Sequence, residues 1–491
     1  MIPPKPQMPP FKSRYAAALA ALQAGRVGAA QSAFRELLRE RPDVPEIHFQ
    51  LSRIAHHAGD RAARAAHLRR ALDLKPDEPA LNEAAADAFA ALGERDAALA
   101  AHDRLIAAEP GSIKRRVDKG MYLQLSGEFD AADALFRDLI KRHPDEGALY
   151  RIMLATTRLT ADDPLMAQLE TLLKRPNLPD QSRFHAHFAM AKALEDQERY
   201  AEVFPHLDRA NALQRKLSPY DAAARVAEQG QFRAAQEGAD LTPIALDAAI
   251  RPVFVIGMPR SGTTLVERIL GAHSAVSAGG ELGHALKLAT KFFSANNRLI
   301  PLKSVSDAQL RDYARAYLGL VRRDTGAQAG VVTDKSIQTH LVLGYIAKAM
   351  PEARVVFVHR DPRDVALSIY KNHFALGTHR YGNDLADIAE AIRLFRDQAR
   401  YWSVRLGPRA TSVQYEALVA DPEPEAERLV AFCDLPWEEA CLSPHQSGGQ
   451  VKTLSLAQVR QPIHGGRAAA WRRYEAALQP FIEAWGDTSW D

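Results

Sequence analysis

The chain has 491 residues, 47% of them hydrophobic, and a formal net charge of +3 at pH 7. This length predicts two or three domains with sizeable cores. So small a charge excludes a general nucleic-acid-binding protein. The N-terminal MIPPKPQMPPFKSRY lacks the apolar core of a secretory signal, and no apolar run approaches the length of about 18 residues that spans a bilayer. We therefore expect a soluble, cytoplasmic protein that binds neither nucleic acid nor membrane, with Cys433 and Cys441 reduced.

Three residue types recur every 34 residues in the N-terminal part of the chain. Glycine stands at Gly25, Gly59, Gly93 and Gly127, proline at Pro42, Pro76, Pro110 and Pro144, and alanine at Ala29, Ala63, Ala97 and Ala131. Each glycine separates two helical patterns, so we interpret it as the turn between paired helices and the proline as the start of the next repeat. The alanines are expected where paired helices approach closely.

The period resembles that of the tetratricopeptide repeat. The resemblance implies an all-α solenoid over residues 11–216, regular to about residue 150 and degenerate beyond it, whose groove binds a peptide or protein segment. An ordinary helical bundle is the alternative. Residues 217–250 lack the phase of the repeat and predict a helical connector to a second domain at 251–491.

From Val253 onward, short valine-rich runs alternate with helical patterns. The runs PVFVIG, GVVTDKS, ARVVFVHRD and TSVQYE are typical of strands in a parallel sheet that is buried on both faces. Helices are expected at 263–272, 338–350, 362–371 and 422–432, the last two opened by Asp-Pro caps. This pattern predicts a three-layer α/β domain that binds its ligands beyond the carboxyl ends of the strands.

The segment GMPRSGTT, which follows the first of these strands, has the G-x-x-x-x-G frame of a phosphate-binding loop. Thr263 stands where an NTPase loop carries lysine, and Arg260 is the strong cation of the loop. Backbone N–H groups after Gly262, the hydroxyls of Ser261, Thr263 and Thr264, and the helix dipole all favour an anion. The loop therefore predicts a phosphate-bearing ligand that is held without the usual lysine.

The segment PRSGTTLVERILGAHSAVSAGGE resembles the opening of sulfotransferases, most closely the tyrosylprotein sulfotransferases and their repeat-fused bacterial relatives. The resemblance extends over roughly residues 250–475. It implies transfer of a sulfuryl group from 3′-phosphoadenosine 5′-phosphosulfate (PAPS) to an acceptor hydroxyl, with no metal. It also accounts for the missing lysine, because no Mg²⁺-bridged triphosphate has to be held.

The resemblance further implies a clamp for the 3′-phosphate, formed by Arg360 and Ser368 in VVFVHRDPRDVALS. Asn372 replaces an arginine that the family often has four positions after the serine. A surface ion pair between Arg360 and Asp364 is the alternative interpretation. The family pattern also implies that Tyr415, unless it is a core tyrosine, lies near the nucleotide. Ser455 and Arg467 would belong to a segment that closes on the cofactor.

Glu281 in AGGELGH matches the family's catalytic glutamate, and His284 is the rival base. Lys335 in VVTDKS matches the lysine that points to the bridging oxygen, where a fixed cation stabilises the leaving group. Arg260 and the loop amides are expected to stabilise the departing 5′-phosphate. A helix-capping role for Glu281 and a solvated Lys335 are the alternatives. The pairs His185 with His187 and His373 with His379 lack the carboxylate or cysteine neighbours of a metal site.

Two other function classes stay open. The first is a P-loop NTPase or kinase-like enzyme with an altered loop, because VVTD and VVFVHRD are both compatible with a Walker B strand. The second is a non-catalytic tetratricopeptide scaffold whose nucleotide domain has decayed. For a sulfotransferase, a protein or peptide tyrosine is the favoured acceptor, with a saccharide, a lipid or a small molecule as alternatives.

Overall fold

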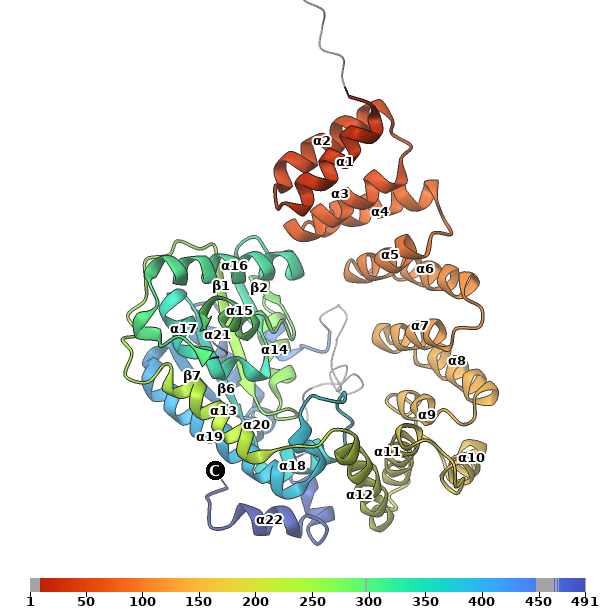
Figure 1. Ribbon diagram of the computed structural model, residues 1–491. Helices are drawn as coiled ribbons and strands as arrows, with labels where there is room; N and C mark the ends of the chain where they lie inside the picture. Colours follow the sequence, from red (N-terminus) through yellow and green to blue (C-terminus); the bar gives the residue numbers. More distant parts are fainter. Residues whose placement is uncertain (1–8, 296–297, 447–462, 464–465, 467, 491) are drawn as a thin grey trace, which may run out of the picture. The chain divides into compact units, whose positions relative to one another are not determined.

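The computed structural model describes residues 9–295, 298–446, 463, 466 and 468–490 (Figure 1). The chain divides into an N-terminal unit, Met1–Tyr122 with Arg322–Gly326, and a C-terminal unit, Leu123–Val321 with Ala327–Asp491. The limits 11–216, 217–250 and 251–491 stay predictions. Among the described residues, every helix is too short or too polar to span a membrane.

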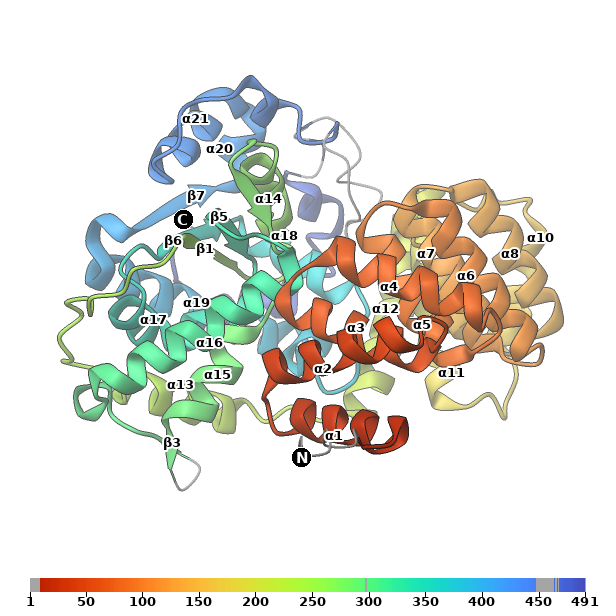
Figure 2. The same ribbon diagram turned by 90° about the horizontal axis from the view of Figure 1, so that it is seen from above.

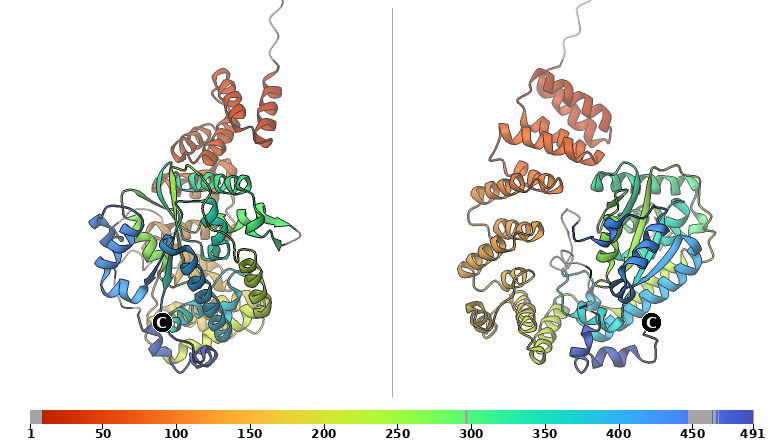
Figure 3. Two further views of the ribbon diagram at one scale, coloured as in Figure 1. Left: turned by 90° about the vertical axis from the view of Figure 1, so that its left-hand side faces the viewer. Right: turned by 180° about the vertical axis from the view of Figure 1, so that it is seen from behind.

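In the described part of the chain, thirteen α-helices precede the first strand and fit the predicted tetratricopeptide-like solenoid. They are α1 (Phe11–Gln23), α2 (Val27–Glu40), α3 (Pro45–Ala58), α4 (Arg61–Leu74), α5 (Pro79–Ala91), α6 (Arg95–Ala108), α7 (Ile113–Ser126), α8 (Phe129–Arg142), α9 (Gly147–Met153), α10 (Pro164–Leu173), α11 (Asp180–Asp196), α12 (Tyr200–Leu217) and α13 (Ala222–Ala234). Consecutive helices such as α3 and α4 pack as pairs (Figure 3).

The four phased glycines all lie at the predicted turns and all have positive φ. The angle is 74° at Gly25, Gly59 and Gly93 and 89° at Gly127. The residue after each glycine donates its N–H to the carbonyl five positions earlier, as Arg26 does to Ala21 over 2.9 Å. This bond satisfies a carbonyl that the helix end would otherwise leave free. Glycine recurs because side chains disfavour the left-handed conformation that the turn requires.

The predicted role of the phased alanines is wrong by one or two residues. Ala29 and Ala131 are exposed, and Ala63 and Ala97 are half-buried. The alanines with almost no exposed surface follow them at Ala30, Ala65, Ala98 and Ala132. The 34-residue spacing locates the first turn of the second helix in each repeat, but it does not show which face of that turn is buried against the neighbouring helix.

The pair α11 and α12 is a degenerate repeat without the signal glycine. Glu198, with φ of 60°, occupies the left-handed position, and Arg199 donates its N–H to the carbonyl of Leu194 over 2.9 Å. The closure of the helix is thus the same as in the regular repeats. The sequence pattern is lost here because a non-glycine residue adopts the strained conformation.

The C-terminal unit contains a five-stranded sheet in the order β2-β5-β1-β6-β7, and all of its strand pairs are parallel. The strands are β1 (Ile250–Gly257), β2 (Val276–Ala278), β5 (Gly330–Asp334), β6 (Arg354–His359) and β7 (Ala410–Gln414). A separate antiparallel pair joins β3 (Ser294–Ala295) to β4 (Arg298–Leu299). The four predicted strands are confirmed, whereas the short β2 was not predicted.

Helices cover both faces of this sheet, as predicted for a three-layer α/β domain (Figure 2). The α-helices are α14 (Thr263–Gly271), α15 (His284–Phe293), α16 (Asp307–Thr325), α17 (Leu343–Ala349), α18 (Pro362–Tyr370), α19 (Leu385–Leu406), α20 (Tyr415–Ala420), α21 (Pro422–Phe432) and α22 (Gln479–Trp485). Short 3₁₀ turns are η1 (Leu302–Ser304), η2 (Ile337–Val342), η3 (Arg380–Asn383), η4 (Gly407–Arg409), η5 (Glu439–Leu442) and η6 (Ala470–Tyr474). Successive side chains of β1 point to opposite faces of the sheet, and their contacts show which helices cover each face. Val253 and Val255 pack with α14 and α21 on one face, whereas Phe254 contacts Tyr317 of α16 on the other.

Two details differ from the predicted helices. The helix expected at 338–350 is η2 followed by the short α17. Asp361 caps α18 by accepting a hydrogen bond from the N–H of Arg363, but Asp421 makes no such side-chain bond to α21. Asp421 is at once the C-cap of α20 and the N-cap of α21, and its side chain accepts no hydrogen bond from the first turn of α21. Cys433 and Cys441 are free and buried, as predicted.

Candidate active site

The predicted site residues follow the carboxyl ends of all five parallel strands. Arg260 comes after β1, Glu281 after β2, Lys335 after β5, Arg360 after β6 and Tyr415 after β7. Because the strands are parallel, these five positions share one edge of the sheet. Residues scattered over more than 150 positions of sequence are therefore gathered at one end of the domain.

The loop between β1 and α14 has the close packing of a ligand cradle. A Cβ atom at Gly257 would lie 2.4 Å from Ser261 Oγ and 2.9 Å from the carbonyl oxygen of Val358. Gly262 has φ of 104° and is the N-cap of α14. Ser261 is 1% exposed, and its hydroxyl has no hydrogen-bond partner among the described residues. The buried hydroxyl and the helix N-terminus fit a bound oxyanion.

Tyr415 packs directly against this loop. A Cβ atom at Gly262 would lie 2.5 Å from Cδ2 of the Tyr415 ring. On the same ring, the guanidinium carbon of Arg360 lies 4.5 Å from the ring centroid, which is a cation–π contact. Tyr415 is thus a buried side chain that lines the loop, and its place near the nucleotide stays a prediction.

The structure brings the predicted phosphate ligands together. Arg260 donates from Nε to Ser368 Oγ over 3.0 Å, and Arg360 donates from Nη1 to the carbonyl of Arg260 over 3.1 Å. Arg260 also has φ of 71°, a conformation that non-glycine residues adopt at a cost and that is frequent at functional sites. The side chain expected beside the 5′-phosphate therefore contacts Ser368, which is expected at the 3′-phosphate.

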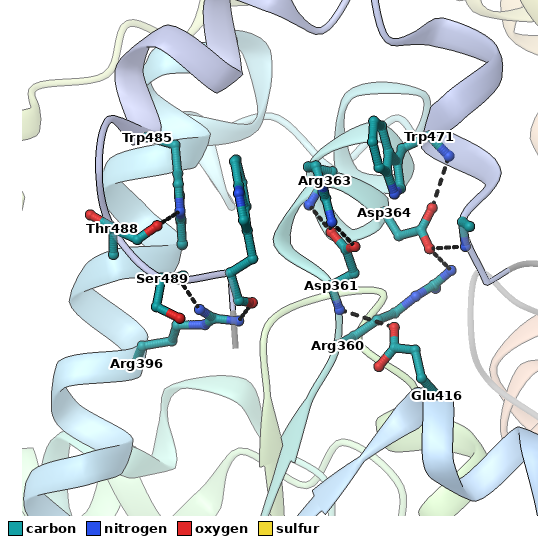
Figure 4. A network of polar contacts seen from close by, with 12 residues as sticks. Arg360, Asp361, Arg363, Asp364, Arg396, Glu416, Trp471, Trp485, Thr488 and Ser489 are labelled. Atoms are coloured by element: carbon teal, nitrogen blue, oxygen red, sulfur yellow. Dashed lines mark hydrogen bonds and ion pairs between the residues drawn. The ribbon is translucent and has the colours of Figure 1, made fainter.

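The alternative partner of Arg360 is also present, but it is not at the surface. Arg360 Nη2 lies 3.6 Å from Asp364 Oδ2, and the two side chains are 8% and 1% exposed. Asp364 accepts hydrogen bonds from the backbone N–H groups of Ala469 (2.8 Å) and Trp471 (3.0 Å), as Figure 4 shows. Burial raises the pKa of Asp364, against the attraction of Arg360. Asp364 thus links the arginine to the chain near η6.

Aromatic stacking holds the C-terminal segment in place on this side (Figure 4). Arg363, paired with Asp361, lies over the Trp471 ring at 3.9 Å and over the Trp490 ring at 4.6 Å. Arg396 of α19 donates to the carbonyls of Ser489 and Trp490. The contacts to Trp471, Ser489 and Trp490 were not predicted, because they join residues that are about 90 or more positions apart.

The predicted catalytic pair is in direct contact. Lys335 donates from Nζ to Glu281 Oε1 over 2.8 Å, and its backbone N–H donates to the carbonyl of Gly280 over 2.8 Å. The Lys335 side chain is 5% exposed, whereas that of Glu281 is 57% exposed. Lys335 is therefore a buried cation and not the solvated lysine of the alternative interpretation. Glu281 covers it from the solvent side.

Two buried carboxylates support this pair, and the sequence analysis assigned neither of them to it. Glu267 of α14 is 6% exposed and accepts hydrogen bonds from the N–H of Gly280 (2.8 Å) and from Thr333 Oγ1 (3.1 Å). Burial raises the pKa of Glu267, opposed by the charge of Lys335. Its position on the apolar face of α14, beside Val266 and Ile269, was a signal that could have identified it.

Asp334, the last residue of β5, is the second of these carboxylates. It is fully buried, accepts a hydrogen bond from the hydroxyl of Tyr317 over 3.0 Å, and also accepts one from Ser336. Ser336 in turn accepts the N–H of Gly283 over 2.7 Å. Burial raises the pKa of Asp334, and the nearby His284 opposes this shift. Asp334 therefore anchors the turn that carries Glu281 and His284.

Several predicted residues contribute less. Thr263 is buried and Thr264 is half-buried at the start of α14. Ser455 and Arg467 lie outside the described residues. The ring of His185 contacts that of His373, and the ring of His187 contacts that of His206. Within the described ranges, no group of three or more His, Cys, Asp or Glu side chains is arranged to hold a metal ion.

Comparison with known proteins supports one family. Residues 252–439 match the model of the Sulfotransferase family. An "Uncharacterized protein" of Aquifex aeolicus (strain VF5) is 30% identical over 73% of this chain and 48% of its own length. Protein-tyrosine sulfotransferase 1 of Danio rerio is 26% identical over 45% of this chain and 63% of its own length. The chain thus spans about half of the first relative and less than two thirds of the second.

A solved structure described as the sulfotransferase domain from the Synechococcus PCC 7002 olefin synthase is 18% identical, with a TM-score of 0.35. The alignment covers 48% of this chain and 97% of that one. The family assignment therefore rests on the sequence matches, which fall on the loop and strands described above. Residues 252–439 thus match the sulfotransferase family, and an N-terminal helical region precedes them in this chain.

Proposed function

We propose that this protein transfers a sulfuryl group from PAPS to an acceptor hydroxyl. The observation that carries the proposal is the placement of Arg260, Glu281, Lys335, Arg360 and Tyr415 after the five strand ends of a sulfotransferase-family domain. The resemblance of the sequence to sulfotransferases implied these roles for the same residues. Their convergence at one sheet edge supports those roles.

The residues of the site fit a doubly phosphorylated nucleotide. The buried Ser261 hydroxyl, Gly262, Thr263, Thr264 and the N-terminus of α14 would hold the 5′-phosphate. Arg360 and Ser368, joined through Arg260, would hold the 3′-phosphate. Bound PAPS would supply the sulfuryl group and a leaving group that departs as a phosphate.

Glu281 and Lys335 would carry out the two remaining steps, proton removal from the acceptor and stabilisation of the leaving group. The exposed Glu281 carboxylate is accessible to an acceptor and would take the proton of its hydroxyl. Glu281 holds the buried Lys335 ammonium, while the backbone N–H of Lys335 donates to the Gly280 carbonyl. The ammonium would stabilise negative charge on the leaving phosphate. Glu267 and Thr333 would keep the turn at Gly280 in position.

The geometry is less favourable for an NTPase or kinase-like enzyme. Asp334 is the carboxylate that a Walker B strand in VVTD would use. It is fully buried, and hydrogen bonds from Tyr317 and Ser336 occupy its oxygens. The loop also lacks the lysine of an NTPase. The contact between Lys335 and Glu281 likewise supports an intact site and not a decayed scaffold domain.

Equilibrium binding of nucleotides tests the proposal. We expect the full chain to bind 3′,5′-adenosine bisphosphate more tightly than ATP. Arg360→Ala should weaken binding of the bisphosphate by about 1.5–3 kcal/mol and that of adenosine 5′-monophosphate much less. Arg251→Ala removes the same charge at the opposite end of β1 and should change neither affinity. Preference for ATP would contradict the proposal, and equal losses for both adenosine nucleotides would remove Arg360 from the 3′ site.

The acceptor and the location belong to the same proposal. The relatives named as protein-tyrosine sulfotransferases favour a protein or peptide tyrosine, bound with help from the helical repeats. Sulfate transfer from labelled PAPS to a tyrosine-containing peptide would test this choice. A cytoplasmic location stays a prediction.

A further inference from the structure

A second basic cluster lies in the C-terminal unit, outside the phosphate loop. Arg151 of α9 donates from Nε to His185 Nδ1 of α11 over 2.9 Å. The His185 ring lies 4.7 Å from the ring of His373, which follows α18. Phe184 stacks on His373, with ring centroids 5.5 Å apart and an interplanar angle of 11°. Three elements distant in sequence thus bring one arginine and two histidines together.

Arg151 has no acidic partner among the described residues. No described carboxylate lies within ion-pair distance of it, and its one hydrogen bond within the described ranges is the bond to His185. Its side chain is half-buried, and this burial lowers the pKa of Arg151 to about 10. Its remaining N–H donors meet no acceptor in the described part of the chain, so they are available to an anion.

The histidines are neutral and add donors instead of charge. Because Arg151 donates to Nδ1, the neutral His185 ring carries its proton on Nε2. Burial and the charge of Arg151 lower the pKa of His185 to about 2 and that of His373 to about 3. A bound anion would oppose the effect of Arg151 on both rings.

The frame around the cluster is rigid. A Cβ atom at Gly147 of α9 would lie 2.1 Å from the carbonyl oxygen of Ser182, so α9 and α11 are in close contact. On the other side, Asn211 donates to the carbonyl of Tyr370 (2.9 Å) and Gln214 to that of Phe374 (2.7 Å). These bonds from α12 hold the segment that carries His373. Such a preorganised arrangement favours ligand binding over collapse onto the arginine.

We propose that Arg151, His185 and His373 form an oxyanion-binding site that is separate from the nucleotide loop. The ligand is a carboxylate or sulfate group, for which the planar guanidinium is the matching donor. Its source is either a free inorganic anion or an acidic side chain of a bound peptide. The site is five residues beyond Ser368 in the chain, and Asn372 donates to the Ser368 carbonyl over 2.6 Å. His373 therefore lies close in the chain to the predicted 3′-phosphate clamp.

The test follows the ¹³Cε1 resonances of His185 and His373 in the full chain, assigned with His185→Gln and His373→Gln. Inorganic sulfate and a capped tri-aspartate peptide are titrated separately at constant ionic strength. We expect both resonances to move saturably. Arg151→Met should abolish these shifts, whereas Arg158→Met, which removes an exposed arginine five residues beyond α9, should leave them unchanged. If sulfate shifts the resonances at lower concentration than the peptide, the ligand of the site is a free anion. If the peptide does so, the ligand is an acidic side chain.

Thermal unfolding provides an independent readout. Without added anion, Arg151→Met should unfold at or above the temperature of the wild type, because a charge that lacks a carboxylate has been removed. Should that variant fail to fold, Arg151→Lys keeps the charge and should weaken sulfate binding roughly tenfold by losing the fork of donors. Resonances that do not respond to either probe, or that respond equally in Arg151→Met, would overturn the proposal.

Discussion

At the scale of single residues, the burial of Lys335 and the exposure of Glu281 fit the two different roles proposed for these charges. Lys335 is buried, so its ammonium is held where it can act on a leaving group. Glu281 is exposed, so it can meet an acceptor. His284, the first residue of α15, lies three positions after Glu281 and stays the rival base of the sequence analysis.

The choice between the two bases can be measured. Glu281→Ala should reduce turnover by about 10²–10⁴-fold, the usual contribution of a positioned general base. The affinity for 3′,5′-adenosine bisphosphate should change little, because the nucleotide-binding residues lie on other strand ends. His284→Ala should reduce turnover much less.

The reverse result would assign the proton transfer to His284. A Glu281→Ala protein that no longer bound the bisphosphate would show instead that the glutamate shapes the site through Lys335. Glu281→Gln separates these cases, since it keeps the size of the side chain and an oxygen acceptor for Lys335.

At the scale of elements, the turn from β1 into α14 depends on glycine for two separate reasons. Gly262 has φ of 104°, and a side chain there would also collide with Tyr415. Tyr415 in turn supports Arg360 through its ring. A side chain at Gly262 should therefore displace Tyr415 and, through it, Arg360 of the predicted 3′-phosphate site.

We expect Gly262→Ala to cost about 1–3 kcal/mol in backbone strain and to weaken binding of 3′,5′-adenosine bisphosphate at least tenfold. Calorimetric titration and thermal unfolding measure the two effects. The matched substitution Gly230→Ala lies within α13, where a Cβ atom meets nothing within 4 Å, and it should be neutral or stabilising. Unchanged nucleotide affinity in Gly262→Ala would mean that this loop does not form the phosphate site.

At the scale of the whole molecule, the last helices of the solenoid belong to the same compact unit as the sheet. Tyr370 donates from its hydroxyl to Asp208 over 2.8 Å, and Lys371 pairs with Glu195. Tyr474 also donates to Glu195, over 2.9 Å. Helices α11 and α12 thus hold the end of α18 and the chain at η6.

Truncation tests this dependence. A fragment of residues 247–491 lacks Glu195 and Asp208, and it should unfold at a lower temperature than a fragment of residues 144–491. The longer fragment should bind 3′,5′-adenosine bisphosphate as tightly as the full chain, because every predicted nucleotide ligand and its supports are present. Equal stability of the two fragments would show that α11 and α12 are dispensable for the sheet.

Buried neutral histidines predict a loss of stability in acid. His340 is 4% exposed, donates from Nδ1 to the carbonyl of Ile337 over 2.8 Å, and has its pKa lowered by burial from 6.5 to about 4. A lowered pKa means that the unfolded chain binds the proton first. The stabilisation is therefore complete above pH 6.5 and is lost as the pH falls toward 4.

Over that window, His340 alone should lower the free energy of unfolding by about 1.4 kcal/mol per pH unit. Asparagine can make the same bond to Ile337 without titrating, so His340→Asn should show a shallower pH dependence in denaturant unfolding. Identical slopes for the two proteins would contradict the assignment.

The sequence by itself determined the features that depend on local conformation. The 34-residue period predicts the paired helices because glycine is needed wherever φ is positive, and the valine-rich runs predict four of the five strands. The loop GMPRSGTT and the spacing of Arg360 and Ser368 also identify candidate ligands. Residues at consecutive strand ends meet because parallel strands present the same edge.

Tertiary structure alone decided which side chains meet across long stretches of sequence. Arg260 contacts Ser368, Asp364 binds the chain at Ala469 and Trp471, and Arg151 lies beside His185 and His373. Such contacts depend on the packing of several elements at once, and no local pattern encodes them. The true position of the close-packed alanines was missed for the same reason, whereas the apolar face of α14 did carry a local signal for the buried Glu267. A local pattern specifies backbone conformation, whereas burial and charge pairing depend on what the rest of the fold places opposite.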